Sequence, residues 1–559
     1  MLKIRKKFQL EVIQMKNNDS NTATLRRLGL DDLGSQARQG KLDRREFIKR
    51  AAALGFAAPF ATSLLSQSVQ AATPKKGGKI VLGMAYGSTT DSLIPGQNEN
   101  GFISTLSYGY QNQLTEIDNN GRTIPELAES FEANADATTW IFKLRQGVEF
   151  HNGKTMTADD VIPSFNYHRG EDTKSAGKAF LTAVTSITKK GKYEVEFQLE
   201  EGNADFPSIV SSGQFPIVPA NDGVLDWQSY VGTGGFTLES FEPGVRASLK
   251  RNPNYFKPDR AHFDEVEMIS LLDTTARQNA VMNGSVHSIS RVDPKTVHLM
   301  ARVSNLKIVE ATGTLHYTFP MRVDVKPFDN NDLRMAVKLS VDREQLVQKI
   351  LLNHGALGND HPISTANPYH NGDLPQRSYD PDKARYHLKK AGMENITLDL
   401  STSDAAFAGA VDTALLMKDS AARAGLNINV IREPKDGYWS NVWNKKPWCA
   451  CYWSGRPTED WMFSAAYTAG GKWNDTAWHT GPEADLFNKL VVEARAELDT
   501  NKRRVLYYEC QKIVSNHGGA LVPMFANFIL ALDKSVMHDK LAGNFDYDGY
   551  KAAERWWFA

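Results

Sequence analysis

The short motifs that most often mark catalysis are absent from this sequence. It holds no HExxH zinc motif, no GxSxG nucleophile motif, no Walker loop for phosphate and no CxxC pair. Glu459 and Asp460 are neighbouring carboxylates, but hydrolysis by two carboxylates requires groups that face each other across a substrate. The 13 histidines are scattered, and His151 falls in a predicted turn, where a structural role is favoured. We therefore expect no enzyme, no metal site and no cofactor.

The three cysteines, Cys449, Cys451 and Cys510, are too few for a disulfide framework, and their odd number argues against one as well. Cys449 and Cys451 share one face if their segment is extended. A zinc site there would need further ligands nearby. Packed free thiols are the favoured interpretation.

The composition is that of a globular protein with room for two or three domains. Of 559 residues, 41% are apolar and 23% are charged, and Lys plus Arg equal Asp plus Glu in number. The resulting net charge of zero argues against a nucleic-acid partner.

The first 71 residues are organised like an export signal. The pair Arg44-Arg45 precedes an apolar run, Ala51–Leu65, and the small-residue site Val69-Gln70-Ala71 follows it. We expect residues 1–71 to be a twin-arginine signal region that is cleaved, so that a periplasmic protein begins near Ala72. A buried N-terminal helix after a basic arm is the alternative.

The stretch 127–168 predicts a strand, a turn and a capped helix. Trp140, Phe142 and Leu144 alternate with Ile141, Lys143 and Arg145, which is the period of a half-buried strand. Asn152-Gly153 is a turn dipeptide. Thr157 stands three residues before Asp160, which is the spacing of a capping box at a helix start.

Later segments predict a hairpin and a βαβ unit. The hairpin joins 237–242 to 246–252 through Pro243-Gly244. A helix is expected to begin at Asp380-Pro381 and to end at Gly392. Thr397–Ser401 and Ile428–Arg432 predict strands on either side of a helix. Further expected elements include strands at 79–85, 193–199 and 521–525 and helices at 332–339, 487–498 and 503–515.

Several of these segments resemble the sequence motifs of one family, and they occur in the same order. The run LAESFEANADATTWIFKLRQGVEFHNGKTMTADDVIPSFNYH (127–168) is similar to the signature of extracellular solute-binding proteins of the peptide/nickel/opine import family, family 5. So are VGTGGFTLESFEPGVRASLKRNPNY (231–255) and YDPDKARYHLKKAG (379–392). The resemblance spans nearly all of 77–530, and Pro163 departs from the usual aromatic or aliphatic residue.

The resemblance implies an α/β architecture, the two-lobed periplasmic-binding-protein fold of class II type, in the large cluster with an extra subdomain in the first lobe. Lobe I is expected at 72–312, including the extra subdomain, and lobe II at 313–515. Residues 516–559 are expected to return to lobe I.

The resemblance also implies a function without catalysis. The chain is expected to be the periplasmic solute-binding component of an ATP-binding-cassette importer, acting as a monomer with a membrane permease as its partner. It would capture a small carboxylated, amino-acid-derived, opine-like or peptide-like solute between its lobes. The alternatives are a di/oligopeptide or oligosaccharide binder on the same fold and, from a different class, an exported peptide-holding chaperone or enzyme.

The best candidate site is the segment 451–461, which matches a second-lobe segment of peptide binders. In those proteins an acid directly after a Gly or Ala holds the peptide's ammonium, but here that position is Arg456. A guanidinium presents a planar fork to carboxylate or phosphate and cannot hold an ammonium. We hypothesise that Arg456, with Arg322, binds an anionic group. The alternative is an internal salt bridge from Arg456 to Glu459 or Asp460.

Other candidates would supply contact area or a second charge. Trp453 or Trp461 is expected to pack against the ligand body, and Asp460 or Glu459 to receive a cationic group. Core packing is an equal alternative for the remaining aromatic candidates. Those candidates are Tyr438, Trp439 and Trp443, just before the segment. Tyr110 and Asn112 match a first-lobe segment that faces the ligand in the family.

Overall fold

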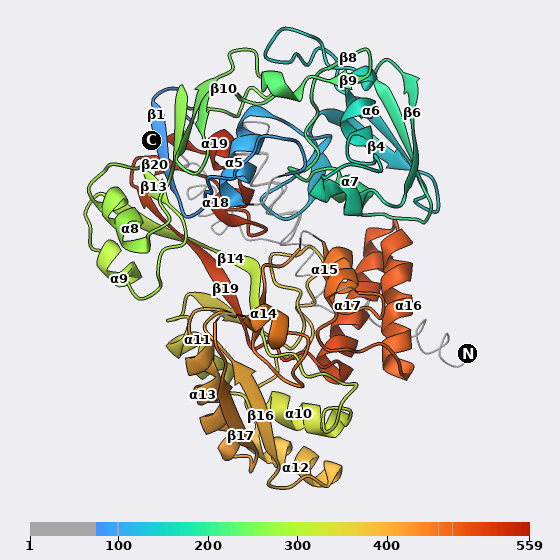
Figure 1. Cartoon of the computed structure of the whole chain (residues 1–559), viewed down its shortest axis with the longest axis vertical. Coiled ribbons are helices and arrows are strands. Elements are labelled where there is room, and N and C mark those ends of the chain that lie inside the picture. The colour runs from blue at the N-terminus through green and yellow to red at the C-terminus, as the bar shows by residue number, and fades with distance from the viewer. Residues whose placement is uncertain (1–73, 98–99, 436, 457, 472) are drawn as a thin grey trace, which may run out of the picture. The chain divides into compact units, whose positions relative to one another are not determined.

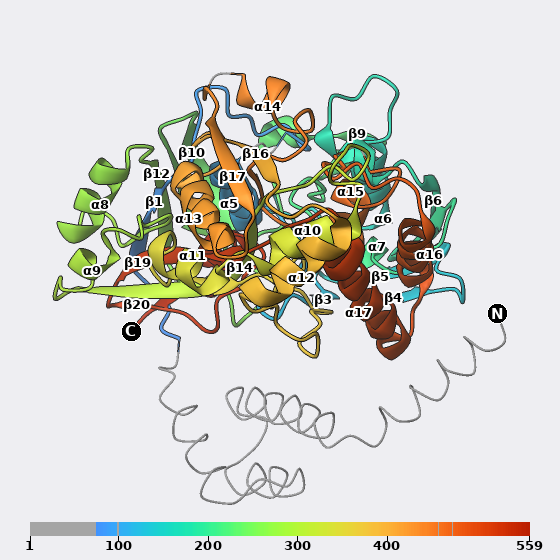
Figure 2. The same ribbon diagram turned by 90° about the horizontal axis from the view of Figure 1, so that it is seen from below.

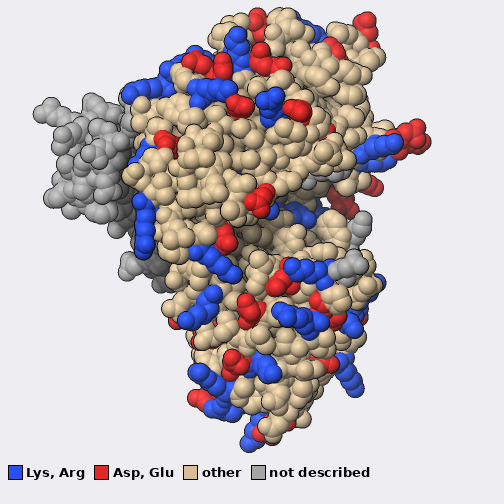
Figure 3. Space-filling view, turned by 60° about the vertical axis from the view of Figure 1, so that its left-hand side comes forward, with Lys and Arg blue, Asp and Glu red and all other residues tan. Residues whose placement is uncertain are grey.

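The computed structural model describes residues 74–559 apart from 98–99, 436, 457 and 472. The predicted signal region, 1–71, lies outside the described residues. Among the helices of the described ranges, none combines the length and the apolar character that crossing a membrane requires. Acidic and basic side chains are interspersed on the face shown in Figure 3, in keeping with the zero net charge.

The largest sheet in the described part of the chain has nine strands. They are β1 (Lys79–Met84), β10 (Phe236–Glu242), β11 (Arg246–Arg251), β12 (Glu265–Ser270), β13 (Ser288–Ile289), β14 (Leu306–Thr318), β15 (Gly355–Leu357), β18 (Cys451–Trp453) and β19 (Met524–Asp533). Their order is β10-β11-β12-β1-β13-β19-β14-β18, with β15 also beside β19. β1 is parallel to β12 and β13, and the predicted hairpin of β10 and β11 is confirmed.

Two long strands of this sheet connect the upper and lower parts of Figure 1. β14 and β19 pair antiparallel from Leu306 opposite Asp533 to Tyr317 opposite Met524, with a register shift between Thr312 and His316. The strand predicted at 521–525 begins only at Met524. Pro523 has no amide hydrogen to donate to a ladder, which explains the later start.

Helices cover both faces of the first part of the sheet. Ile80, Leu82 and Met84 of β1 are buried in one core cluster, which includes residues of the first helix, and the odd-numbered Val81 packs against another. This alternation places core on both sides of β1. The helices of this part are α5 (Gly101–Tyr110), α8 (Thr274–Met282), α9 (Val297–Met300), α18 (Asp546–Gly549) and α19 (Ala552–Arg555).

A separate four-stranded antiparallel sheet has its own core. Its strands follow the order β4 (Ala128–Ala133), β5 (Thr139–Leu144), β7 (Glu194–Leu199) and β6 (Val184–Gly191). Trp140, Phe142 and Leu144 of β5 are buried, as predicted. The capping box of Thr157 and Asp160 is confirmed at the start of α6 (Ala158–Asn166). The short elements beside this sheet are β2 (Thr115–Ile117), β3 (Thr123–Pro125), α7 (Phe206–Ile209), β8 (Ala220–Asn221) and β9 (Val224–Leu225).

The lower part of Figure 1 contains the predicted βαβ unit. β16 (Thr397–Thr402) and β17 (Asn427–Arg432) pair in parallel, and α13 (Ala410–Ala422) lies beside them (Figure 2). The predicted helix after Asp380 is α12 (Pro381–Ala391), and Gly392 ends it with a φ of 67°. The other helices of this unit are α10 (Asn331–Leu339), α11 (Arg343–Lys349) and α14 (Tyr438–Asn441).

Three helices form the adjoining core: α15 (Glu459–Ala466), α16 (Pro482–Ala496) and α17 (Thr500–His517). Phe463, Phe487 and Tyr507 pack together there. Cys449, Cys451 and Cys510 are all buried free thiols. The last strands of the chain are β20 (Val536–Met537) and β21 (Trp557–Phe558), which pair with each other.

Candidate functional site

A tight turn after β18 positions Arg456. Trp453, the last residue of β18, stands opposite His316 of β14. Gly455 follows with a φ of +80°, and the Thr314 hydroxyl donates to the Ser454 carbonyl at 2.9 Å. A Cβ on Gly455 would overlap with the Thr314 side chain and lie 2.8 Å from its carbonyl oxygen. Only glycine therefore fits the turn that presents Arg456.

The Gly455→Ala variant is expected to lose both stability and binding. The left-handed conformation alone costs a residue with a side chain about 1–3 kcal/mol, and relief of the overlap would displace the next residue, Arg456. Denaturant unfolding and solute titration measure the two effects. Gly470→Ala is the matched control, since Gly470 has open space around its Cβ position. Wild-type stability and affinity in Gly455→Ala would contradict the assigned geometry.

The Arg456 guanidinium lies among aromatic rings instead of carboxylates. Its central carbon is 5.5 Å from the ring centroid of Trp453 and 5.8 Å from that of Trp473. One nitrogen donates to the Gly455 carbonyl at 2.6 Å. Burial lowers the pKa of Arg456. Within the described ranges, no carboxylate forms an ion pair with this guanidinium, which leaves a positive charge with donors to spare.

The neighbouring rings form one cluster, which we call the aromatic cradle: Trp439, Trp443, Tyr452, Trp453 and Trp473. Successive rings are in contact, with centroids 5.6–6.3 Å apart. Trp439, Tyr452 and Trp473 are exposed, whereas Trp453 is buried. The cradle thus offers an accessible aromatic surface beside a cation. Trp439, Trp443 and Trp453 were named as candidates from the sequence, whereas Trp473 was not, and Tyr452 was included only as part of the segment 451–461.

The predicted acidic candidates have partners inside the protein. Asp460 accepts from Arg495 Nε at 3.0 and 3.1 Å, and Glu459 accepts from the Tyr369 amide at 2.7 Å. Burial raises the pKa of Glu459 to about 7. Among the described residues, neither acid forms the alternative salt bridge to Arg456. Capture of a cationic group by either acid stays a prediction.

Four other predicted residues also lie in internal contacts. The Asn112 amide donates to Glu126 and Tyr255 at 3.0 and 3.1 Å, and Tyr110 is buried in the core. The Tyr438 hydroxyl donates to the Ala450 carbonyl at 2.7 Å. The fourth, Arg322, pairs with Asp324 at 2.7 Å and donates to the Asn444 carbonyl. Internal hydrogen bonds or ion pairs thus engage Asn112, Tyr438 and Arg322, and packing holds Tyr110. That any of these side chains faces a ligand stays a prediction.

Trp461, in α15, contacts residues that lie far before it in the sequence. Its ring contacts Phe180 with centroids 4.4 Å apart. It also lines a cavity of about 60 Å³ together with Tyr108, Ser212 and Lys551. Near this point Arg503 and Asp205 form an ion pair of 2.7 Å. Trp461 therefore packs against residues far before it in the sequence. Its contact with a ligand stays a prediction.

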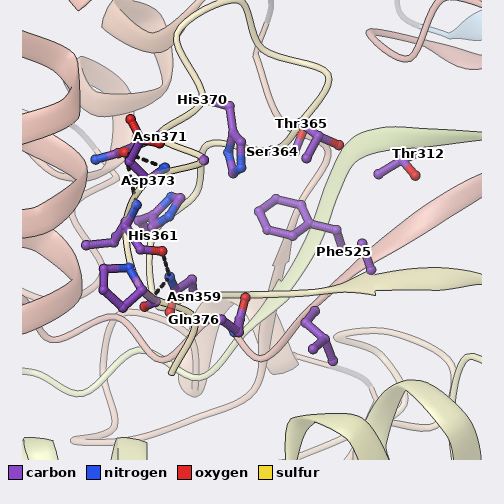
Figure 4. Close-up of a pocket in the computed structure, with 15 residues that line it drawn as sticks. Thr312, Asn359, His361, Ser364, Thr365, His370, Asn371, Asp373, Gln376 and Phe525 are labelled. Atoms are coloured by element: carbon purple, nitrogen blue, oxygen red, sulfur yellow. Dashed lines mark hydrogen bonds between the residues drawn. The ribbon is translucent and has the colours of Figure 1, made fainter. Parts of the chain in front are cut away.

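A larger cavity of about 420 Å³ lies beside β15 and β19 (Figure 4). His361, His370 and Phe525 line it. Burial lowers the pKa of both histidines, of His361 to about 3. Its lining shares no residue with the aromatic cradle or with the smaller cavity. The sequence analysis did not predict this cavity, whose lining comes mostly from residues 356–376 and is completed by Thr312 and Phe525.

The fold and its neighbours define a class: a two-lobed α/β binding protein. The profile of the bacterial extracellular solute-binding proteins, family 5 Middle, matches residues 122–475. The chain belongs to that family. The structure of HbpA2 from Haemophilus parasuis is similar with a TM-score of 0.74 at 19% identity, covering 84% of this chain and 99% of that one.

Curated relatives are peptide-binding proteins by name. The oligopeptide-binding protein AppA of Bacillus subtilis (strain 168) is 27% identical over 350 residues, which are 60% of this chain and 63% of AppA. Di/tripeptide-binding protein 1 of Pseudomonas aeruginosa (strain UCBPP-PA14) is 24% identical over 519 residues, covering 85% of this chain and 94% of the relative.

Proposed function

We propose that this chain is the periplasmic solute-binding component of an ATP-binding-cassette importer. It captures a small carboxylated solute, amino-acid-derived, opine-like or peptide-like, between two lobes and delivers it to a membrane permease. Lobe I comprises 72–312, lobe II 313–515, and 516–559 return to lobe I. The protein acts as a monomer without catalysis, after twin-arginine export. Family membership supports the transport role.

The observation that carries the solute class is the setting of Arg456. Its guanidinium has aromatic neighbours and, among the described residues, no acidic partner within ion-pair distance. A carboxylate is the natural ligand for the unused fork of donors, and the exposed rings supply area for the rest of the solute. An ammonium would be repelled by the same charge. This argues for recognition of the acidic end of a solute.

A di- or oligopeptide is the second candidate, and the names of AppA and of di/tripeptide-binding protein 1 favour it. A peptide also carries a terminal carboxylate, so it is compatible with Arg456 if it binds in that orientation. Its ammonium would then need an acceptor other than Asp460, which is paired with Arg495.

Matched pairs of solutes test the proposal in the wild-type protein. Isothermal titration compares an N-(1-carboxyethyl) amino acid and a dipeptide with their C-terminal amides. We expect each acid that binds to do so at least about tenfold more tightly than its amide, since a charge-assisted contact contributes about 1.5–3 kcal/mol. Equal affinity for acid and amide would overturn the anionic site.

Mass spectrometry of the natively purified protein distinguishes import from peptide holding. One carboxylated solute at a ratio of one to one is the expected result. A heterogeneous mixture of peptides would instead favour the exported peptide holder.

A further inference from the structure

A buried carboxylate lies beneath the aromatic cradle. Asp475 Oδ2 accepts from the indole Nε1 of Trp443 at 3.1 Å and from that of Trp453 at 3.4 Å. Trp443 follows α14, whereas Trp453 ends β18. One oxygen atom therefore ties together two rings that belong to different elements.

The backbone around Asp475 is fixed from both sides. The side-chain amide Nδ2 of Asn474 donates to the backbone carbonyls of Tyr467, Thr468 and Trp478 at 3.0–3.4 Å. On the other side, the Val323 amide donates to the Thr476 carbonyl at 2.8 Å. Hydrogen bonds therefore hold the chain in place on both sides of Asp475.

The burial of the Asp475 carboxylate is not explained by a gain in stability. Asp475 is buried, and no Lys, Arg or His of the described ranges forms an ion pair with it. A buried acid without a cation is costly unless hydrogen bonds compensate it. The compensation comes from the rings of the cradle, one of which, Trp453, carries the Arg456 guanidinium on its face.

We propose that Asp475 is a positioning residue for solute binding. By accepting from both indoles it fixes Trp443 and Trp453, and through Trp453 it fixes the place of the Arg456 guanidinium. This inference rests on the proposed function, because it assigns Asp475 to the same site. No contact between Asp475 and the solute is required.

The test uses Asp475→Leu, which removes the acceptor, and Asp475→Asn, which retains one carbonyl oxygen in the same shape. The probe is the free acid that binds most tightly in the panel of N-(1-carboxyethyl) amino acid and dipeptide. We expect Asp475→Leu to weaken its binding at least tenfold and Asp475→Asn to weaken it less than threefold. Equal losses in both variants, or none in Asp475→Leu, would overturn the proposal.

Indole N–H resonances provide a readout in the ligand-free protein. With assignments from Trp443→Phe and Trp453→Phe, we expect Asp475→Leu to shift the signals of Trp443 and Trp453 and to leave that of Trp140 in place. Trp140 serves as the control because its indole donates to the Asn203 carbonyl at 3.0 Å. Unchanged signals for both cradle indoles would show that Asp475 does not position them.

The pH profile separates positioning from a merely structural role. Burial raises the pKa of Asp475 to about 6. The titratable groups that face it are Cys449, Cys451 and Tyr467, and burial raises the pKa of each. These three groups stay neutral between pH 5 and pH 8, so Asp475 is the member of this set that titrates there. Protonation leaves Asp475 neutral with one carbonyl acceptor, as Asp475→Asn does, so wild-type affinity is expected to fall by less than threefold as the pH drops through about 6.

Asp475→Asn is expected to abolish this pH dependence, and Glu459→Gln to retain it. Glu459 is the matched control, since its pKa of about 7 lies in the same window but its carboxylate faces the Tyr369 amide. The reverse pattern would overturn the proposal. If the wild type binds none of the acids, the proposed function fails. The indole signals decide separately whether Asp475 holds the rings.

Discussion

Replacing Arg456 by alanine is expected to weaken the binding of a carboxylated solute about ten- to a hundredfold. A hydrogen bond to a charged group contributes about 1.5–3 kcal/mol, and each 1.4 kcal/mol is a factor of ten in affinity. The guanidinium donates one hydrogen bond to the Gly455 carbonyl and has no ion-pair partner among the described residues. The contact with the solute is therefore lost without an internal rearrangement. Isothermal titration with the free acid and its amide measures the change.

The amide should bind Arg456→Ala about as well as it binds the wild type, because it never gained from the charge. Arg456→Lys is expected to fall between the two proteins, since an ammonium keeps the charge but loses the planar fork and the stacking. Arg322→Ala is the matched control. Its donors serve Asp324 and the Asn444 carbonyl, so the affinity should remain near that of the wild type.

Arg456→Ala should also fold at least as stably as the wild type when no solute is present. A guanidinium that is largely withdrawn from water and lacks an ion pair is a liability for the empty protein. Burial accordingly lowers its pKa. A clear loss of stability in ligand-free Arg456→Ala, with unchanged affinity, would assign this residue to structure instead of binding.

Local features of the fold were predictable because their causes lie within a few residues. The burial of Trp140, Phe142 and Leu144 follows from alternation along one strand. The start of α12 at Pro381 and its end at Gly392 follow from a proline at the first turn and a glycine that accepts a positive φ.

The internal partners of the site could not be predicted, since they come from distant parts of the chain. Arg495 lies 35 residues from Asp460, and its guanidinium removes that acid from any pairing with Arg456. Glu459 is held by an amide 90 residues away. Asp475 stands 32 residues from Trp443, and no local pattern links an aspartate to a pair of tryptophans at such spacing. Only the tertiary structure shows which charges remain available for a solute.

The second large effect concerns a buried network of charges that links residues from 116 to 257 with Lys551 and Glu554. Lys257 and Lys551 lie among Glu116, Glu126 and Glu554, whose carboxylates are close enough together to resemble a metal site. Lys257 contacts the three acids at 2.6–2.9 Å. Lys551 contacts Glu116 and Glu126 at 2.9 and 2.7 Å. The two ammonium groups offset the negative charge of the three carboxylates, as a bound metal ion would.

Lys551→Met is expected to lower the free energy of unfolding by about 3–5 kcal/mol, because removal of one partner leaves buried charge uncompensated. Denaturant unfolding measures the loss. Lys512→Met is the matched control: Lys512 is exposed, its contact with Glu509 is 3.3 Å, and such a surface pair contributes about 0–1 kcal/mol. Adding Glu126→Gln to Lys551→Met should restore part of the loss by removing one of the buried negative charges that Lys257 would otherwise have to neutralise without Lys551. No restoration would indicate that packing, instead of charge, sets the effect.

The same network determines how stability responds to acid. Burial alone would raise the pKa of Glu554, but Lys257 and Lys551 lower it to about 2, below the ordinary value of 4.5. An acid with a depressed pKa in the folded state contributes stability that is present above its unfolded pKa and lost as the pH falls. The wild type should therefore lose this contribution between about pH 4.5 and pH 2. Lys551→Met should raise the pKa of Glu554 in the folded state. The contribution of Glu554 to stability should then be smaller in the variant, and it should be lost at a higher pH than in the wild type. Unfolding free energies measured from pH 7 to pH 3 test this order, and parallel profiles for the two proteins would contradict it.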